Sequence, residues 1–548
     1  MESTMNALLV KGSKLLTASS LSIAIMTSAQ QASAAAMVPS QQPLFLTQGV
    51  APNILVTLDD SGSMAFAYAP DAAVSQRNKN YFKSNYFNPM YYSPTTEYKL
   101  PKKVTLVSGE LKITEYDTPT FTAAWKNGFT KASAVNLSSN YAATVDYGRG
   151  SDVNTAADGR AHYYEYRPNN ANCNKTKTDT DCYSKVNIPA TVADEQNFAI
   201  WYSFYRTRAL ATQTAANLAF YSLPENVRLT WQVLNNSSCN VMGRGSSSGN
   251  CNTNYLREFS GQHRANFFTW LEKLSVTGGT PLRRAMQRAG DFLGQTGING
   301  PYAYSLGKQT NPEYACRPTY HILMTDGIWN SDSASVGNAD NTNIATLPDG
   351  KSYTAIAPYK DGASNTVADL AFNYWRRDAR TNIDNKIKPF ISAANPTDST
   401  KEYWDPRNNP STWQNMTTFT LGLGLTSSLT SPAWGGSTFE GDYGKLADGS
   451  IAWPAASNNS ANNVYDLWHA AINSRGEFFS ADSPEDMVSA FQTILTRIGD
   501  RNNSAARPAI TAKLQESPSG DTLLRYAYQS SFDSSKNWAG DLIRYKLE

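Results

Sequence analysis

A run of acidic and hydroxyl side chains near the N-terminus has the residue types of a cation site. The run Asp59-Asp60-Ser61-Gly62-Ser63 directly follows Asn53-Ile54-Leu55-Val56-Thr57-Leu58, a short apolar segment typical of a buried strand. One carboxylate and two hydroxyls therefore stand at the carboxyl edge of a predicted sheet, where open α/β sheets bind their ligands. Such oxygens suit a hard divalent cation. Taken alone, the same run also fits a turn-capping role.

Two further loops add oxygen donors at the ends of other predicted elements. Thr277-Gly278-Gly279-Thr280-Pro281-Leu282 places Thr280 just before a predicted helix, and Met324-Thr325-Asp326-Gly327 places Asp326 after a second buried strand. Each motif is weak alone, but the three agree with one another in order and in context. They predict a site for a divalent cation, Mg²⁺ first and Mn²⁺ or Ca²⁺ as alternatives. Neutral hydroxyl ligands would leave that ion able to attract an acidic group from a partner.

The elements that must position these loops alternate between strand and helix, which favours a parallel sheet covered on both faces. We therefore predict an α/β fold with a doubly wound, mostly parallel sheet. The predicted strands cover 53–58, 227–234, 320–325 and 416–425. The predicted helices cover 196–221, 265–274, 281–293, 367–380 and 485–498. Long polar insertions lie between them, at about 66–190, 236–260, 330–366 and 426–462.

Both ends of the chain differ from this core in composition and in hydrophobic pattern. Lys11 and Lys14 precede an apolar stretch from Leu15 to Met26, and small residues follow, so residues 1–36 have the pattern of a secretory signal. The alternative, a membrane anchor, is disfavoured because the stretch is short and interrupted by serines. We predict one domain over 37–500, no transmembrane segment, and a linker with the start of a β domain over 501–548. The last predicted strand has no following strand to pair with, so we expect further β structure beyond it.

Export makes the five cysteines candidates for disulfides. The simplest pairing joins Cys173 to Cys182 and Cys239 to Cys251, and other arrangements stay open. Cys316 is then left over. We expect it to be a buried inert thiol, because its neighbourhood lacks an activating His or Lys pattern; the alternative is a thiol that forms an intermolecular or stress-sensitive bridge.

Composition and missing motifs exclude several function classes. Charged residues make up 17% of the chain and the formal net charge is +2, so there is no strong nucleic-acid signal. The sequence has no His-Glu-x-x-His zinc motif, no Gly-x-Ser-x-Gly elbow and no phosphate-binding loop. His321 and His469 lie in a strand-like and a helix-like run, where packing is the expected role. We predict a binding protein rather than an enzyme.

These residues together resemble the von Willebrand factor A fold and, more widely, the N-terminal half of the type IV pilus tip adhesin family PilY1 (PilC). The likeness covers most of the chain after residue 36. We expect the family's C-terminal β-propeller to be truncated here, because the final motif resembles that propeller's first strand. The motifs that carry the resemblance are Pro52-Asn53-Ile54-Leu55 with Asp59-Asp60-Ser61-Gly62-Ser63-Met64, Thr277-Gly278-Gly279-Thr280-Pro281-Leu282, His469-Ala470-Ala471, Arg475-Gly476-Glu477-Phe478-Phe479 and Trp538-Ala539-Gly540-Asp541-Leu542.

The resemblance implies a metal-ion-dependent adhesion site with Asp59, Ser61, Ser63, Thr280 and Asp326 as ligands. It also implies an exported protein at the pilus tip, the outer-membrane surface or the periplasm of a Gram-negative bacterium. Such a protein supports pilus assembly with minor pilins, twitching motility, surface sensing and adhesion to a host-cell or surface ligand with an acidic group. The alternative is a competence factor for DNA uptake. A cytosolic chelatase partner is disfavoured by the export signal and the cysteine pairs.

Overall fold

The computed structural model describes most of the chain between residues 50 and 502. The described ranges are 50–146, 151–152, 159–235, 239–243, 254–303 and 313–502, with the backbones of four C-terminal strands. The predicted signal peptide at 1–36 lies outside them, and the domain boundaries stay a prediction. Among the described residues, no helix combines the length and the apolar character that crossing a membrane requires.

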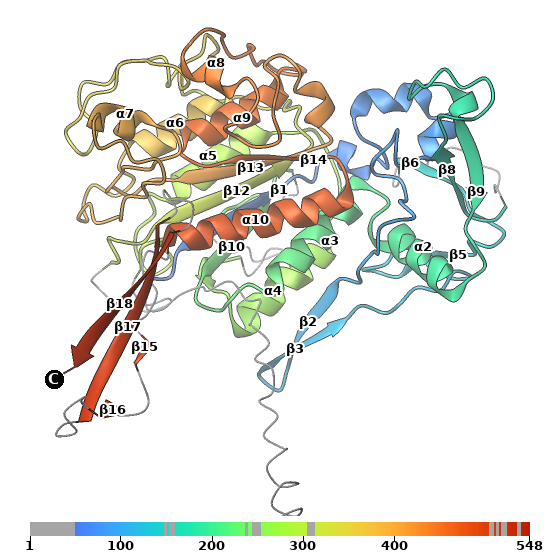
Figure 1. The fold of residues 1–548 in the computed structure, drawn as a ribbon, viewed down its shortest axis with the longest axis horizontal. Helices are drawn as coiled ribbons and strands as arrows, with labels where there is room; N and C mark the ends of the chain where they lie inside the picture. The colour runs from blue at the N-terminus through green and yellow to red at the C-terminus, as the bar shows by residue number, and fades with distance from the viewer. Residues whose placement is uncertain are drawn as a thin grey trace, which may run out of the picture. The chain divides into compact units, whose positions relative to one another are not determined.

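A six-stranded sheet lies at the centre of the fold (Figure 1). Its order is β11-β10-β1-β12-β13-β14, and every neighbouring pair is parallel except β10 and β11. The order therefore reverses at β1, which makes the gap between β1 and β12 the topological switch point. The predicted doubly wound, mostly parallel α/β fold is confirmed. The strands are β1 (Asn53–Leu58), β10 (Arg228–Val233), β11 (Arg257–Glu258), β12 (Thr319–Thr325), β13 (Thr417–Leu423) and β14 (Phe478–Ala481).

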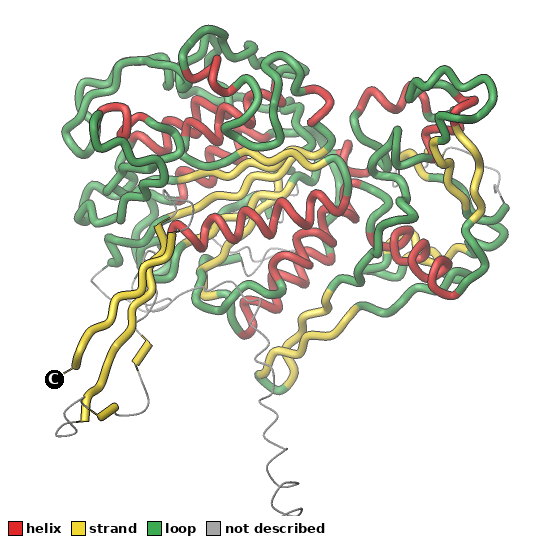
Figure 2. The backbone as a smooth tube through the Cα atoms, in the orientation of Figure 1, coloured by secondary structure: helices red, strands yellow, loops and turns green. Residues whose placement is uncertain are grey.

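Helices cover both faces of this sheet (Figures 1 and 2). Alternate side chains of β1 point to opposite faces, so Leu55 packs in one apolar cluster while Ile54 and Val56 pack in the other. Such fully buried side chains contribute about 1.5–3 kcal/mol each. The first cluster includes α5 (Leu282–Phe292), α6 (Val367–Arg376) and α9 (Asn463–Asn473), and the second includes α3 (Arg208–Phe220), α4 (Gly261–Glu272) and α10 (Pro484–Asn502).

The prediction of one helix over 196–221 is wrong. Two helices occupy this stretch, α2 (Val192–Phe204) and α3, with a break between them. Thr207 takes an extended conformation, and its side chain accepts a hydrogen bond from the backbone of Leu210, which starts α3 as a new helix. The apolar spacing continues across the break, so periodicity alone gives one element where a cap makes two.

Near the predicted end of the core, β14 was not predicted from the sequence, and α9 was predicted only as the helix-like run around His469. β14 has only four residues and pairs with β13 along the sheet edge. Gly476 makes this pairing possible, because a Cβ at that position would overlap the carbonyl oxygen of Thr418. The short helices α7 (Ser399–Trp404) and α8 (Tyr443–Ala447) lie in the later part of the chain, the second within the predicted insertion at 426–462.

The first insertion is folded around aromatic side chains rather than being a plain polar loop. Tyr92, Phe198 and Trp201 contact one another within a buried cluster that α2 shares with the insertion. The described residues of the insertion also form short 3-10 helices and four antiparallel strand pairs. The strand pairs are β2 (Lys102–Val107) with β3 (Glu110–Glu115), β4 (Ala124–Asn127) with β5 (Ala132–Val135), β6 (Thr144–Asp146) with β7 (Ser151–Asp152), and β8 (His162–Tyr166) with β9 (Tyr183–Asn187).

The C-terminal segment forms paired strands. β17 (Leu523–Asp533) and β18 (Ala539–Leu547) run antiparallel, from Arg525 opposite Leu547 to Asp533 opposite Ala539. The last strand is therefore paired with the strand that precedes it, and the expectation of further β structure beyond it stays a prediction. Two short strands, β15 (Ala509–Ile510) and β16 (Gln515–Glu516), also pair with β17.

The cysteines agree with the predicted pairing with one correction. Cys173 and Cys182 form a disulfide, as predicted. Cys239 is also disulfide-bonded, while its predicted partner Cys251 lies outside the described residues. Cys316 is a free thiol, but it is exposed, so the expectation of a buried thiol is wrong. It lies in a turn just before β12, where the chain runs along the surface before entering the sheet.

Candidate metal centre

The three predicted loops meet at the carboxyl ends of β1 and β12. The amide of Gly62 donates to the carbonyl of Gly278 at 3.1 Å, and the amide of Thr277 donates to the carbonyl of Asp60 at 2.6 Å. β1 and β12 are adjacent strands, so Asp59 and Asp326, which follow them, reach the same edge of the sheet. The candidate centre therefore sits at the topological switch point, the place where doubly wound folds bind ligands.

Asp59 is fully buried and held at both carboxylate oxygens. Its Oδ1 accepts the backbone N–H of Ser61 at 2.7 Å, and its Oδ2 accepts the hydroxyl of Thr325 at 2.6 Å. Burial raises the pKa of Asp59 above its ordinary value, and the nearby charge of Asp326 raises this pKa further. A buried pair of like charges is costly unless a cation offsets it.

The two serines link the carboxylates to each other. The hydroxyls of Ser61 and Ser63 lie 3.0 Å apart. Ser61 also hydrogen-bonds to Asp59 through its side chain, and Ser63 does so to Asp326. Burial raises the pKa of Asp326, and the facing guanidinium of Arg208 opposes that rise. The structure thus brings four of the five predicted residues into one chain of side-chain contacts.

Thr280 reaches the same edge through its backbone. Its amide donates to Oδ1 of Asn330 at 3.0 Å, and its carbonyl accepts the amide of Asn330 at 2.9 Å. The side chain is buried, with 3% of its surface exposed. Gly279 is required beside it, because a Cβ there would overlap the side chains of Asn330 and Ser331. The loop is therefore fixed against the Asp59 run at Gly278, while the contacts of Asn330 set the position of Thr280.

The donor chemistry of these residues fits a hard divalent cation. They offer two carboxylates and three hydroxyls, with no sulfur or imidazole, which is the oxygen-only set that Mg²⁺, Mn²⁺ and Ca²⁺ prefer. Asp60, although adjacent, has a different role. Its Oδ1 accepts the amides of Leu234 at 3.0 Å and Asn235 at 2.8 Å, which ties the end of β1 to the end of β10.

Two residues beside the centre were missed by sequence reasoning, Thr325 and Arg208. Arg208 is 1% exposed, and its Nη1 donates to Oδ2 of Asp326 at 2.9 Å. Its Nη2 donates to Oδ1 of Asp71 at 2.6 Å. No sequence motif identifies Arg208, and the sequence predicts it in the interior of a single helix over 196–221, where nothing distinguishes it from a surface charge. Thr325 had a usable signal, since it precedes Asp326 at the end of a buried strand.

The histidines lie away from this chemistry. His321 is buried in β12, its Nε2 lies 2.8 Å from the hydroxyl of Thr57, and burial lowers its pKa to about 3. It is therefore a neutral packed side chain. His469 is buried in α9, where its Nε2 donates to the carbonyl of Tyr359 at 2.6 Å and its ring stacks on Trp453. Both positions agree with the packing role expected from the sequence.

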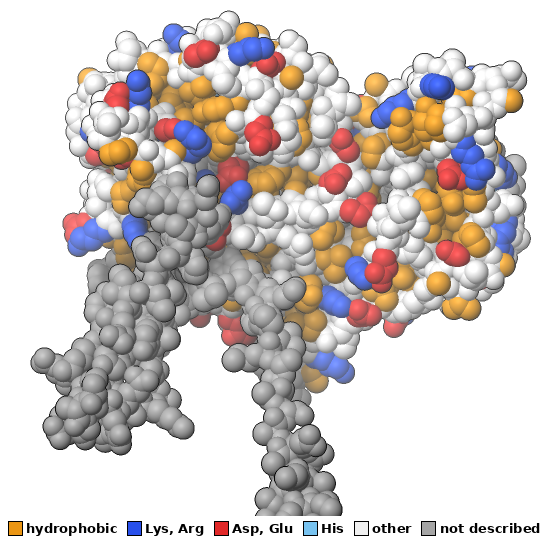
Figure 3. Space-filling view, in the orientation of Figure 1, with side chains coloured by type: hydrophobic (Ala, Val, Ile, Leu, Met, Phe, Trp, Pro, Cys, Tyr) orange, Lys and Arg blue, Asp and Glu red, His pale blue; other side chains and the backbone are white. Residues whose placement is uncertain are grey.

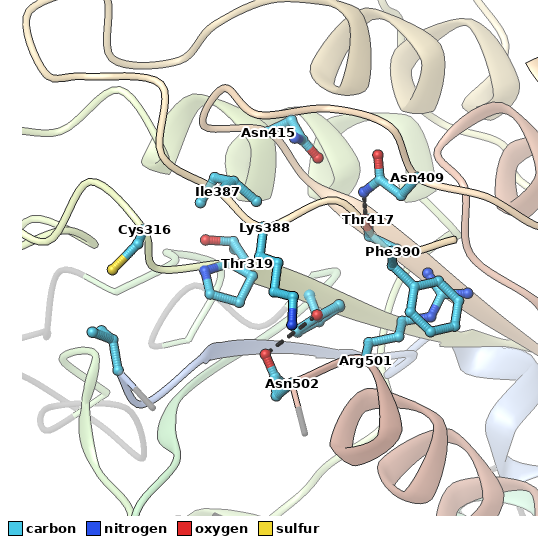
Figure 4. Close-up of a pocket in the computed structure, with 13 residues that line it drawn as sticks. Cys316, Thr319, Ile387, Lys388, Phe390, Asn409, Asn415, Thr417, Arg501 and Asn502 are labelled. Carbon is cyan, nitrogen blue, oxygen red and sulfur yellow. Dashed lines mark hydrogen bonds between the residues drawn. The ribbon is translucent and has the colours of Figure 1, made fainter. Parts of the chain in front are cut away.

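A surface hollow lies at the other edge of the sheet (Figure 4). Its volume is about 170 Å³, and Thr319 and Thr417, the first residues of β12 and β13, line it. Cys316 and Arg501 stand at its sides. Because Thr319 begins the strand that Asp326 follows, this hollow is separate from the candidate metal centre.

Charges of both signs are mixed on the molecular surface. On the face in Figure 3, Lys and Arg side chains are interspersed with Asp and Glu. This mixture agrees with the formal net charge of +2. That face therefore lacks the one-sign field that would steer a polyanion to it.

Comparison with known proteins finds close sequence relatives. The chain is 61% identical over 530 residues to the type IV pilus biogenesis factor PilY1 of Pseudomonas aeruginosa strain PAO1, covering 97% of this chain and 45% of that protein. The factors of the same name from strains PAK and UCBPP-PA14 are 62% and 50% identical over 535 and 552 residues, covering 97% and 98% of this chain and 45% and 46% of those proteins. The resemblance to the PilY1 family is confirmed, and the chain spans less than half the length of these relatives.

No protein-family model matches the chain. Among solved structures, the vWF domain of the type V pili tip protein Mfa5 from Porphyromonas gingivalis is 13% identical with a TM-score of 0.22, and the match covers 54% of this chain and 88% of that chain. A similarity of this size carries no argument about function.

Proposed function

We propose that this chain, a relative of the PilY1 pilus biogenesis factors over 97% of its length, is the metal-dependent binding part of an exported, pilus-associated protein. The observation that carries the proposal is the chain of contacts Asp59–Ser61–Ser63–Asp326 at the switch point of the sheet. Asp59, Ser61, Ser63, Thr280 and Asp326 would hold a divalent cation, with Mg²⁺ as the first candidate. The relatives' name supports a role in pilus biogenesis.

The residues would act by binding and orienting, not by covalent chemistry. Asp59 is fixed by Ser61 and Thr325, so its oxygens are already oriented before a cation arrives. The cation, when bound, would supply a positive charge. An acidic group of a partner would then complete the coordination of the cation. The partner we propose is a minor pilin at the pilus tip or a host-cell or surface ligand that carries a carboxylate. The disulfide between Cys173 and Cys182 supports export over a cytosolic role.

Replacement of Asp59 by Ala tests the metal site. Mg²⁺ that binds only the folded chain stabilises it by an amount that grows with the logarithm of the free Mg²⁺ concentration above Kd, so the wild type should melt higher in MgCl₂ than in EDTA. Asp59→Ala should melt at the same temperature in both.

Asp369→Asn is a matched control, because Asp369 is a buried aspartate that caps α6 and is not among the proposed ligands. It should lower the melting temperature yet keep the Mg²⁺ shift. An unchanged Mg²⁺ shift in Asp59→Ala would contradict the site.

A second measurement separates binding from assembly. Bacteria that carry Asp59→Ala in the complete protein should still display pili but adhere poorly to surfaces if the centre binds an external ligand. Pilus counts by electron microscopy and adherent cell counts give the two readouts. Loss of pili and adhesion together would instead favour a minor pilin as the partner of the centre.

A further inference from the structure

Arg208 joins the candidate metal centre to the first insertion. It is the first residue of α3 and is 1% exposed. Its guanidinium donates to Asp326 at 2.9 Å, to Asp71 at 2.6 Å and to the carbonyl of Tyr68 at 2.9 Å. One anionic partner is a proposed metal ligand, and the other belongs to the insertion. Arg208 therefore touches both parts at once.

The start of the insertion also lies against the backbone of this residue. The backbone amide of Arg208 donates to the carbonyl of Phe66 at 2.9 Å, so the chain that leaves the Asp59 run returns beside it. The rings of Phe66 and Tyr68 stack with centroids 4.9 Å apart, and the guanidinium carbon lies 5.3 and 5.5 Å from them. We call residues 66–71 the neck segment. Arg208 fixes it together with Asn88, whose side chain hydrogen-bonds to the backbone of Ala67 and Ala69.

A cation at the centre and the guanidinium of Arg208 would compete for the carboxylate of Asp326. Without a cation, Arg208 is the nearest positive charge to the buried carboxylate of Asp326, whose side chain is 5% exposed. A divalent cation held by the same carboxylate would place a second positive charge beside the guanidinium. Like charges repel strongly in a buried site, where water screens them little. Asp71 is 52% exposed and offers the guanidinium an alternative partner on the neck segment.

We propose that Arg208 couples occupancy of the metal centre to the insertion. A divalent cation at Asp326 weakens the Arg208–Asp326 ion pair and shifts the guanidinium toward Asp71 and the neck segment. Coupling between two sites is reciprocal, so a change at the neck segment alters the affinity of the centre for its cation by the same factor. The inference rests on the proposed function, and it makes the insertion a regulator of that site.

Two substitutions, one at Arg208 and one at its partner Asp71, give opposite expected results. Arg208→Gln removes the competing charge and leaves Asp326 for the cation, so Mg²⁺ affinity should rise about fivefold or more. Asp71→Asn removes the alternative partner and leaves Arg208 on Asp326, so Mg²⁺ affinity should fall. Isothermal titration of the purified full chain with MgCl₂ measures both. General damage to the fold would lower affinity in each variant, so opposite signs are specific to the coupling.

A matched control uses another buried ion pair. Arg380 pairs with Glu313 and is 2% exposed, and neither residue belongs to the centre. Arg380→Gln should lower the melting temperature while leaving Mg²⁺ affinity unchanged. A second readout is hydrogen exchange at the amides of the neck segment. In the wild type MgCl₂ should change their exchange, and in Arg208→Gln this change should be absent.

The outcomes separate this inference from the proposed function. If the wild type binds Mg²⁺ through Asp59 but Arg208→Gln and Asp71→Asn keep its affinity, or shift it in the same direction, the coupling is overturned and the proposed function stands. If neither the wild type nor Arg208→Gln binds Mg²⁺, both are overturned. Binding by Arg208→Gln alone would support the coupling, because the arginine would then be what excludes the cation.

Discussion

The hydroxyl of Thr325 donates a 2.6 Å hydrogen bond to the carboxylate of Asp59, and this contact joins the ends of two adjacent strands. The same hydroxyl accepts the amide of Gly327 at 3.1 Å. Thr325 therefore orients the carboxylate that the proposed site depends on, and it fixes the turn that carries Asp326. Residues that orient a metal ligand in this way commonly affect affinity as strongly as weak ligands do.

Thr325→Val should weaken both the fold and the cation site. Valine has nearly the same shape, so the loss reports on the hydroxyl, and an oxygen of Asp59 is left without its donor inside the protein. We expect a loss of about 1–3 kcal/mol in the free energy of unfolding, measured by urea titration in EDTA. Mg²⁺ affinity, measured by calorimetry, should fall by about tenfold or more.

Thr325→Ser is the control for this prediction, because serine restores the donor but not the methyl group. It should recover most of the Mg²⁺ affinity. Wild-type affinity in Thr325→Val would show that the hydroxyl does not support the centre.

The buried cluster around Asp340 and His469 should make stability fall as pH rises. Burial raises the pKa of Asp340 to about 7, against the opposing charge of His469 and with the help of Asp369 and Asp361. Between about pH 4 and 7 the native chain then holds a proton that the unfolded chain has released, so the free energy of unfolding decreases with pH in this window. Burial alone would lower the pKa of His469, but Asp361 and Asp340 raise it above its ordinary value. As the pH rises through this raised pKa, the native His469 loses its proton and the free energy of unfolding decreases further.

Asp340→Asn tests this linkage, because it removes one titrating group while keeping an oxygen for the amide of Asn473, 2.8 Å from Asp340. Urea unfolding at pH 5 and pH 7.5 in EDTA should show a smaller decrease in stability for the variant than for the wild type. Equal decreases in the two proteins would mean that Asp340 titrates normally in the native state.

The sheet and the candidate site could be predicted because their signals are local. β1 and β12 are continuous apolar runs, and the residues that follow a buried parallel strand must reach one edge of the sheet, so Asp59 and Asp326 could be placed together without coordinates. The same local signals do not report on caps inside a continuing pattern. Thr207 divides α2 from α3 through one side-chain hydrogen bond, and the sequence on either side stays apolar.

That single break explains why Arg208 could not be predicted. In one long helix its side chain would have been one more surface charge, whereas at the start of α3 it enters the centre and meets Asp71, far away in sequence. The aromatic core of the first insertion could not be predicted from the sequence for a related reason. Tyr92 and Phe198 contact each other across about a hundred residues, and composition alone gives no register for such contacts.

Among the cysteines that the structure describes, Cys316 should be the one whose thiol reacts with a maleimide. It is exposed and unpaired, whereas Cys173, Cys182 and Cys239 are in disulfides, so mass spectrometry should detect one label per chain without reductant. Cys316→Ser should take up none, and its melting temperature should stay within a degree or so of the wild type, because a small exposed side chain contributes little to stability.

Oxidation of the wild type should give a covalent dimer on a non-reducing gel, since an accessible thiol can pair with that of a second chain. Label on Cys316→Ser would place the reactive thiol on another cysteine, and an unlabelled wild type would contradict the exposure of Cys316.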